Sequence, residues 1–197
     1  MWIRILGSAA DGGFPHWNCH CPNCQGLRDG LLSSRPRTQS SIAVSADYYQ
    51  WYIFNASPDI MKQIEAFEPL WPQGNGHHRA IQAVILTDAE LEHSLGLLSL
   101  RNGGHLQLYT TQWVRQAIMG CNPILPTLQS STRVDWKQVY LGEFTALPDF
   151  NGANSGLQFK AFTTQSMKPL DYANLPPSPE SVVGIRIVDT KTGGSLV

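Results

Sequence analysis

Three of the four cysteines in the chain lie within one short stretch, as Cys19, Cys21 and Cys24. A disulfide between cysteines this close in sequence is strained, and three thiols cannot all pair with one another. Thiolates are soft ligands that suit tetrahedral zinc, and short spacings let one loop wrap around one ion. The spacing therefore predicts a structural zinc site with these three cysteines as ligands. Unpaired buried or redox-active cysteines are the alternative interpretation.

A closed structural zinc site needs four ligands, so this loop lacks one. His20 lies between two of the cysteines, where it is awkwardly placed to reach the same ion, and His16 is a weaker option. We therefore expect the fourth ligand to be distant in sequence. Another pair, His77 and His78, lies in a loop rich in Pro, Gly and Asn, where adjacent histidines are usually solvated.

A second group of candidate ligands, Asp88, Glu90, Glu92 and His93, follows the wholly apolar run Ala83–Leu86. If this segment is extended, alternate residues point the same way, so three carboxylates converge. Converging carboxylates repel unless a cation or protons lie among them. Carboxylates with one imidazole suit iron, manganese or magnesium better than zinc. The alternative is an ordinary helix start, with Asp88 as the cap, the glutamates near the positive end of the helix dipole and His93 on the surface.

The bulk properties narrow the class of protein. A chain of 197 residues can bury a core, and we expect one domain spanning residues 1–197. A net charge of -1 with 15% charged residues indicates neither a nucleic-acid partner nor a membrane surface. The chain has no apolar run long enough for membrane insertion, and its first residues do not resemble a signal peptide. Clustered cysteines without a disulfide framework favour a reducing, cytoplasmic location.

The pattern of apolar residues predicts short strands and helices that would position both groups. Strands are expected at Trp2–Leu6, Ser40–Ser45, Trp51–Asn55, Ala83–Leu86, Leu106–Thr110 and Val182–Val188. Helices are expected at Ile60–Phe67, capped by Ser57 or Asp59, at Ser94–Leu100, and from a Thr111 cap through Met119. The small residues of Gly7–Gly13 predict a tight loop, because they lack the ending of a phosphate-binding P-loop.

Several motifs together resemble the family of pyrroloquinoline quinone (PQQ) biosynthesis B proteins, within the metallo-β-lactamase fold. The motifs are Leu6–Ala10, Gly12–Pro15, Trp17–Cys19 with Cys21 and Cys24, Arg37–Ser41, Asn55–Asp59 and Leu98–Arg101. The resemblance implies an α/β (α+β) fold, an αββα sandwich built from two similar halves. Family members are longer, so it also implies an incomplete sandwich that is truncated at Val197, with the N-terminal half and part of the second.

The resemblance also bears on the acidic segment. In hydrolytic relatives the same strand end has the motif His-x-His-x-Asp-His, which binds two zinc ions. Aligned on Thr87, this chain has Asp88 and Glu90 at the histidine positions and Glu92 at the aspartate, and it retains His93. The loss of two imidazoles argues against dinuclear zinc hydrolysis.

The activity implied by the resemblance is an iron-dependent oxygenase that hydroxylates a tyrosine of a precursor peptide bound to its carrier protein. In the intact protein Glu92 and His93 would hold catalytic iron, and Asp88 or Glu90 would be a ligand or base. The cysteine site would hold separate structural zinc, completed by a C-terminal histidine as in a related phosphodiesterase of phosphonate breakdown.

Two other functions remain open from the sequence. One is a carrier that transports PQQ or its precursor towards the periplasm, in which Phe14 and Trp17 could stack on a flat ring. The other is a metal-dependent hydrolase with unusual ligands. An apolar face left uncovered by the missing half would also favour association into a homo-oligomer.

Overall fold

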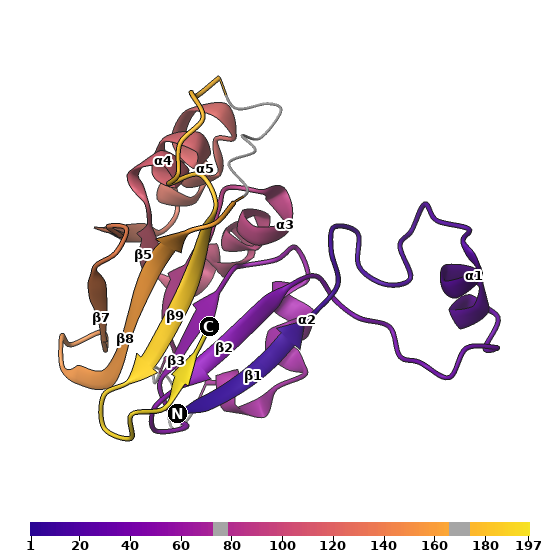
Figure 1. The fold of residues 1–197 in the computed structure, drawn as a ribbon, viewed down its shortest axis with the longest axis horizontal. Helices are drawn as coiled ribbons and strands as arrows, with labels where there is room; N and C mark the ends of the chain where they lie inside the picture. The colour runs from indigo at the N-terminus through magenta and orange to yellow at the C-terminus, as the bar shows by residue number, and fades with distance from the viewer. Residues whose placement is uncertain (73–78, 166–173) are drawn as a thin grey trace.

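The computed structural model describes residues 1–72, 79–165 and 174–197, and two β-sheets pack face to face in it (Figure 1). Among the described residues, the first sheet has six strands in the order β1-β2-β3-β4-β5-β6. These strands are β1 (Trp2–Gly7), β2 (Ser41–Ser45), β3 (Trp51–Phe54), β4 (Ile81–Ile85), β5 (His105–Thr110) and β6 (Arg133–Gln138). Strands β1 to β3 are antiparallel neighbours, whereas β3 to β6 run parallel.

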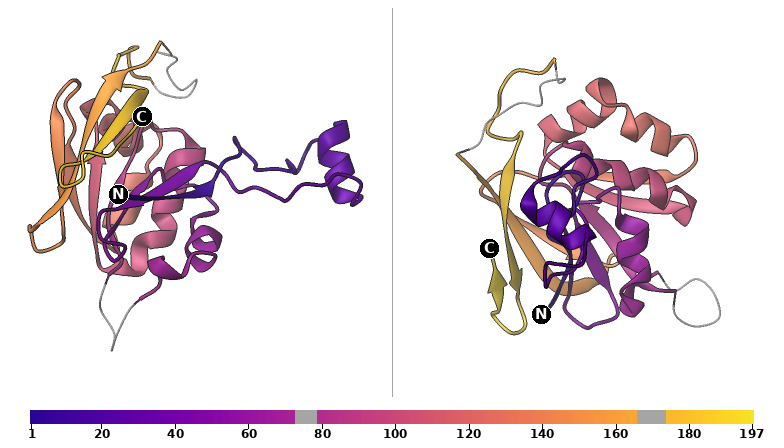
Figure 2. Two further views of the ribbon diagram at one scale, coloured as in Figure 1. Left: turned by 60° about the horizontal axis from the view of Figure 1, so that its bottom comes forward. Right: turned by 90° about the vertical axis from the view of Figure 1, so that its right-hand side faces the viewer.

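Helices connect the parallel strands and cover the outer face of this sheet (Figures 1 and 2). They are α2 (Ile60–Glu65), η1 (Glu68–Leu70), α3 (Leu91–Ser94), η2 (Leu95–Gly103), α4 (Gln112–Gln116), η3 (Ala117–Cys121) and α5 (Ile124–Gln129). Side chains of the sheet such as Ile53 and Val84 pack there against Ile60, Leu97 and Val114. Burial of this apolar surface is what holds such short helices in place, because isolated helices of this length are unstable in water.

The second sheet has the order β10-β9-β8-β7 and packs on the other face of the first. Its strands are β7 (Phe144–Pro148), β8 (Asn154–Thr163), β9 (Val183–Asp189) and β10 (Ser195–Leu196). Between the sheets, Phe159 makes edge-to-face contacts with Phe54 and Tyr109, each at 6.0 Å between ring centroids. Helices, first sheet and second sheet are thus three layers of the expected αββα sandwich.

Residues 8–40 form a long excursion between β1 and β2 that projects away from the sandwich, and we call it the arm (Figures 1 and 2). A short helix, α1 (Pro22–Arg28), lies at its outer end. The two chain segments of the arm are joined by backbone hydrogen bonds between Phe14 and Arg37, at 2.9 and 2.8 Å. The Arg37 guanidinium lies 4.9 Å from the centre of the Phe14 ring, so one face of that ring is covered.

The predicted strands are confirmed to within one or two residues, but two helix predictions need correction. The helix expected at Ser94–Leu100 begins three residues earlier, as α3, and continues as the 3₁₀ helix η2. Neither Ser57 nor Asp59 caps α2 through its side chain. Ser57 donates to the side chain of Gln63, and Asp59 accepts from Gln39, so both oxygens have other partners.

The predicted Thr111 cap is confirmed. The Thr111 hydroxyl oxygen accepts a 3.2 Å hydrogen bond from the backbone N–H of Val114, and α4 begins at the next residue. None of the described helices is long and apolar enough to cross a membrane.

Candidate metal sites

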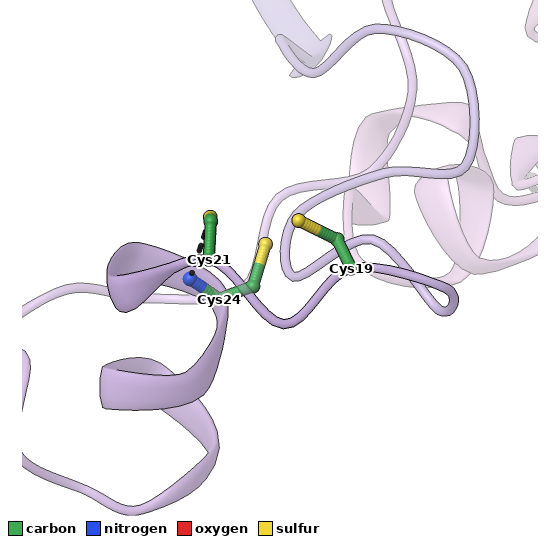
Figure 3. Close-up of side chains that lie close together, drawn as sticks. All are labelled: Cys19, Cys21 and Cys24. Carbon is green, nitrogen blue, oxygen red and sulfur yellow. Dashed lines mark hydrogen bonds between the residues drawn. The ribbon is translucent and has the colours of Figure 1, made fainter.

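The three clustered cysteines lie together at the outer end of the arm, where the loop enters α1 (Figure 3). The sulfur atoms of Cys19, Cys21 and Cys24 all lie within 4.8 Å of one another. Tetrahedral zinc with bonds of about 2.3 Å places its sulfur ligands about 3.8 Å apart, so small side-chain rotations would close this group around one ion. The donor set and its geometry fit zinc.

The start of α1 favours a thiolate at Cys21. Cys21 is the N-cap residue, and its sulfur accepts a 3.5 Å hydrogen bond from the backbone N–H of Cys24. This bond, with further bonds from the thiols of Cys19 and Cys24, lowers the pKa of Cys21 to about 7. A bond with the His16 backbone lowers the pKa of Cys24, but burial and the neighbouring thiols outweigh it and raise that pKa overall. At least one ligand is therefore ready to bind metal near neutral pH.

Arg28 ties the loop to the end of α1. Its guanidinium donates to the backbone oxygens of Cys19 and His16. Neither His16 nor His20 belongs to the cysteine group. Nδ1 of His16 accepts from the backbone N–H of Asn18, and His20 is exposed. The part of the chain that the structure describes thus provides three ligands, and His77 and His78 lie outside it.

The acidic segment is not extended, so the expected convergence of its three carboxylates does not occur. Glu90 is the N-cap of α3, and Glu92 and His93 lie within that helix. The helix turns His93 back towards the strand end, where its Nδ1 lies 2.8 Å from both carboxylate oxygens of Asp88. The alternative of a helix start is confirmed in part, because Glu92 lies in the first turn of α3. The N-cap residue is Glu90 and not Asp88, and His93 is not a surface residue, since only 20% of its side chain is exposed.

Asp88 is buried and accepts several hydrogen bonds. The Thr87 hydroxyl donates to its Oδ2 at 2.8 Å, and the backbone N–H of Glu90 donates to its Oδ1 at 3.0 Å. Burial alone would raise the pKa of Asp88, but the hydrogen bond and charge of His93 outweigh it and lower that pKa. An ionised carboxylate can only accept, so Nδ1 of His93 holds the shared proton and Nε2 is left for another partner.

The ionisation of His93 and Glu92 reflects the same crowding of charge. Burial would lower the pKa of His93, but its bond to Asp88 and the nearby negative charges raise it overall. The pKa of Glu92 is raised by burial and by the charges of Asp11 and Asp88, against the opposing effect of His93. Because Asp11 belongs to the arm, the root of the arm lies close enough to influence the acidic segment.

Within residues 1–72, 79–165 and 174–197, the cysteines are the only group of three or more possible metal ligands whose donor atoms lie this close together. The acidic segment offers the Nε2 atom of His93 and the half-buried carboxylates of Glu90 and Glu92. A non-haem iron site of the common type needs two imidazoles and one carboxylate. The described residues therefore fit part of such a site and do not complete it.

Two further residues, Asn55 and Thr87, shape this site, and neither was assigned a role in it from the sequence. Asn55, at the end of β3, exchanges hydrogen bonds with Thr87 across the end of β4. The backbone of Asn55 has a φ of 65°, in the left-handed region that few side chains adopt. The signals in the sequence were the Asn55–Asp59 motif, directly after an apolar run, and the position of Thr87 directly before the acidic segment.

These features agree with the comparisons with known proteins. The beta-lactamase superfamily domain matches residues 50–196, and the chain belongs to that superfamily. Over its whole length it is 40% identical to coenzyme PQQ synthesis protein B of Pseudomonas putida strain F1, and 41% identical to that of Pseudomonas entomophila strain L48. The chain spans 64% of the length of each of these curated relatives.

Solved structures show the same relationship. The Zn²⁺-bound PqqB from Methylobacterium extorquens superposes with a TM-score of 0.84 and 34% identity, over 98% of this chain and 62% of that one. A diphosphatase from the PhnP family shares the fold, with a TM-score of 0.67 and 17% identity over 94% of this chain and 62% of its own. The expected metallo-β-lactamase fold is therefore confirmed.

Proposed function

We propose that the intact protein acts in PQQ biosynthesis as an iron-dependent oxygenase that hydroxylates a tyrosine of the precursor peptide on its carrier protein. The observation on which this proposal rests is the 40% identity to coenzyme PQQ synthesis protein B along the whole chain. The strand-end segment supports it, because Asp88 and Glu90 replace two imidazoles of a dinuclear zinc site. Hard oxygen ligands with one imidazole suit iron better than a zinc pair.

In this proposal His93 Nε2 and Glu92 are ligands of the catalytic metal, and Glu90 is a ligand or base. Iron, when bound, would supply the activation of dioxygen. The second imidazole would come from the region that corresponds to the remaining length of the relatives. The raised pKa of Glu92 fits a carboxylate that gains from a neighbouring cation, since burial and like charges disfavour its ionised form without one.

We assign structural zinc to Cys19, Cys21 and Cys24, at a distance from the reaction. Support comes from the geometry of the three sulfur atoms and from the Zn²⁺-bound state of the Methylobacterium extorquens relative. Cytoplasmic location and a homo-oligomeric state are further proposals from the sequence.

The test uses the intact protein with ferrous iron, dioxygen, a reductant and the precursor peptide folded onto its carrier. One oxygen atom of dioxygen should enter the tyrosine ring, and the other should leave as water with two electrons from the reductant. Mass spectrometry of the peptide should show one added oxygen atom. Glu92→Gln and His93→Ala should abolish the gain, whereas Glu65→Gln, in α2, should not.

No mass gain with iron bound and the peptide on its carrier would contradict the oxygenase proposal. Tight binding of PQQ without turnover would then favour a carrier. Phosphodiester hydrolysis with manganese would instead favour a hydrolase.

A further inference from the structure

We propose that Asn55 and Thr87 are positioning residues that act through Asp88 to hold His93, and that Asp88 orients this histidine instead of binding the metal. The inference rests on the proposed metal site at His93 and assigns a role to three residues around it. In this arrangement the ring of His93 is fixed through Nδ1, and its Nε2 is the atom presented to the ion. Histidine ligands commonly have such an outer partner, which sets ring orientation.

The hydrogen bonds that run from Asn55 through Thr87 and Asp88 to His93 form a relay. It begins at Asn55, whose backbone is held by hydrogen bonds on two sides. Its N–H donates to the backbone oxygen of Ile85 at 2.8 Å, and its own backbone oxygen accepts from the Ser41 hydroxyl at 2.7 Å. These bonds hold the residue in its left-handed conformation, which asparagine tolerates better than most residues. The side-chain amide is thereby directed across the sheet towards the end of β4.

The amide of Asn55 then fixes both polar groups of Thr87. Its Oδ1 accepts from the Thr87 backbone N–H at 3.0 Å, and its Nδ2 lies 3.0 Å from the Thr87 hydroxyl oxygen. That hydroxyl has a single proton and two acceptors within reach, Asp88 Oδ2 at 2.8 Å and Asn55 Oδ1 at 3.2 Å. The shorter contact is to the charged carboxylate, so we assign the hydroxyl proton to Asp88, while Nδ2 of Asn55 donates to the hydroxyl oxygen. The direction of the relay follows from these two donors.

Asp88 is enclosed by its donors. Oδ1 accepts from the backbone N–H of Glu90, and Oδ2 accepts from the Thr87 hydroxyl. The single proton on Nδ1 of His93 is shared between the two oxygens, which are both 2.8 Å away. Three donors thus surround the carboxylate, and with 4% of the residue exposed Asp88 has no open side for a metal ion.

The turn after β3 also holds the backbone of the same histidine. The residue after Asn55, Ala56, donates its N–H to the backbone oxygen of His93 at 2.7 Å. The side chain of His93 is thus set through Asn55, Thr87 and Asp88, while its main chain is set one residue further along the same turn. This double attachment distinguishes a positioning device from ordinary strand-end hydrogen bonding.

The experiment compares ring nitrogen signals of ¹⁵N-histidine-labelled protein in the 197-residue chain. In the unsubstituted chain, the neutral form of His93 should keep its proton on Nδ1. Thr87→Val removes the hydroxyl at nearly constant volume, so the signals should shift towards the mixed protonation of an unrestrained imidazole. Thr87→Ser should restore them. Thr132→Val, which removes a buried hydroxyl before β6, is the matched control and should leave them unchanged.

A second substitution tests the direction of the relay. Asn55→Asp keeps the shape of the side chain but replaces the Nδ2 donor by an acceptor. The Thr87 hydroxyl should then donate to residue 55, and Asp88 should lose that bond. The His93 signals should therefore change as in Thr87→Val, with amide spectra confirming that the chain is folded.

Mn²⁺, which prefers oxygen and imidazole ligands to thiolates, separates this inference from the proposed function. It should broaden the His93 signals of the unsubstituted chain, and Thr87→Val should weaken its binding by about 10–100-fold. If Thr87→Val and Asn55→Asp leave both the signals and the affinity unchanged, the relay is wrong. If Mn²⁺ never affects His93 while both substitutions still alter its protonation, the relay stands and the metal site fails.

Discussion

The two candidate metal sites are built in opposite ways. The cysteine site uses one short stretch at the outer end of the arm, and a single side chain, Arg28, ties its loop to α1. The acidic site combines the ends of β3 and β4, a short helix and the root of the arm. The first is built from one local stretch outside the sandwich, whereas the second depends on the packing of several elements of the sandwich.

This difference predicts that substitutions at the two sites affect the stability of the rest of the protein differently. The arm contributes little to the two apolar cores, so loss of its metal should leave the sandwich folded. The acidic segment lies directly over the helical core, so a backbone clash there should reduce the stability of the whole domain. Substitutions can therefore test whether the two sites are energetically separate.

The largest expected effect is loss of zinc from the arm. Cys24→Ser removes a buried thiolate ligand, so zinc affinity should fall by more than the roughly 10–100-fold that an outer-sphere partner contributes. The free energy of unfolding of the metal-free chain should change by no more than about 1 kcal/mol. Zinc titration and urea unfolding measure the two quantities. Cys121→Ser, the same chemical change outside the cluster, is the control, and a global loss of stability in Cys24→Ser alone would contradict separate sites.

Gly96→Ala should have the opposite signature, with a loss of stability and unchanged zinc binding. A Cβ at Gly96 would lie 2.1 Å from the backbone oxygen of Ser57, a contact that rigid backbone cannot relieve cheaply. Crowding of this kind costs about 1–3 kcal/mol, measurable by urea unfolding. In the same helix, Gly103→Ala meets nothing within 4 Å and should be close to neutral. Equal effects of both substitutions would refute the steric explanation.

A smaller effect is expected when the hydrogen bonds from Arg28 to the cysteine loop are removed. Arg28→Ala removes two hydrogen bonds to the loop, so zinc affinity should fall about tenfold, which corresponds to about 1.4 kcal/mol. Competition with a coloured chelator measures this. Arg35→Ala, an exposed arginine of the same arm, controls for the lost charge. Equal losses in both variants would show that charge alone is responsible.

The last prediction concerns the stability of the sandwich at alkaline pH, outside both metal sites. Burial between the sheets raises the pKa of Tyr52 and of Tyr109 to about 12. The folded state disfavours both tyrosinates, so stability should be intact below about pH 10 and fall as the pH rises from about 10 towards 12. In a pH titration of the folded chain, part of the tyrosinate absorbance should appear only well above pH 10, and Tyr52→Phe should reduce that part. Titration of both buried tyrosines near pH 10 in folded protein would contradict this.

Much of the fold could be predicted because local patterns decide it. The short apolar run Ala83–Leu86 indicated a buried strand, which is β4, and the close spacing of the three cysteines brings them together. Thr111 caps its helix because the cap depends on neighbours three residues away. Features that depend on residues close together in the sequence could therefore be predicted correctly.

The acidic segment shows what the sequence alone does not determine. Whether Glu90 and Glu92 converge depends on where α3 begins, and that start is set by Asp88 and by contacts with the turn after β3. The partners of Asp88 include Thr87, which is fixed by Asn55 from another strand. Hydrogen bonds between residues far apart in sequence produce no periodic pattern of residue types. An extended acidic segment was therefore as consistent with the sequence as a helix start.

The register of the first two strands has a consequence for the arm. Gly7 and Ser41 lie opposite each other in neighbouring antiparallel strands, so residues 8–40 are, in topological terms, an enlarged hairpin loop. The free-energy cost of closing a loop grows only slowly with its length. A tight turn could therefore replace the entire excursion without re-routing any other strand, and the excised segment could be grafted between two antiparallel strands of an unrelated scaffold.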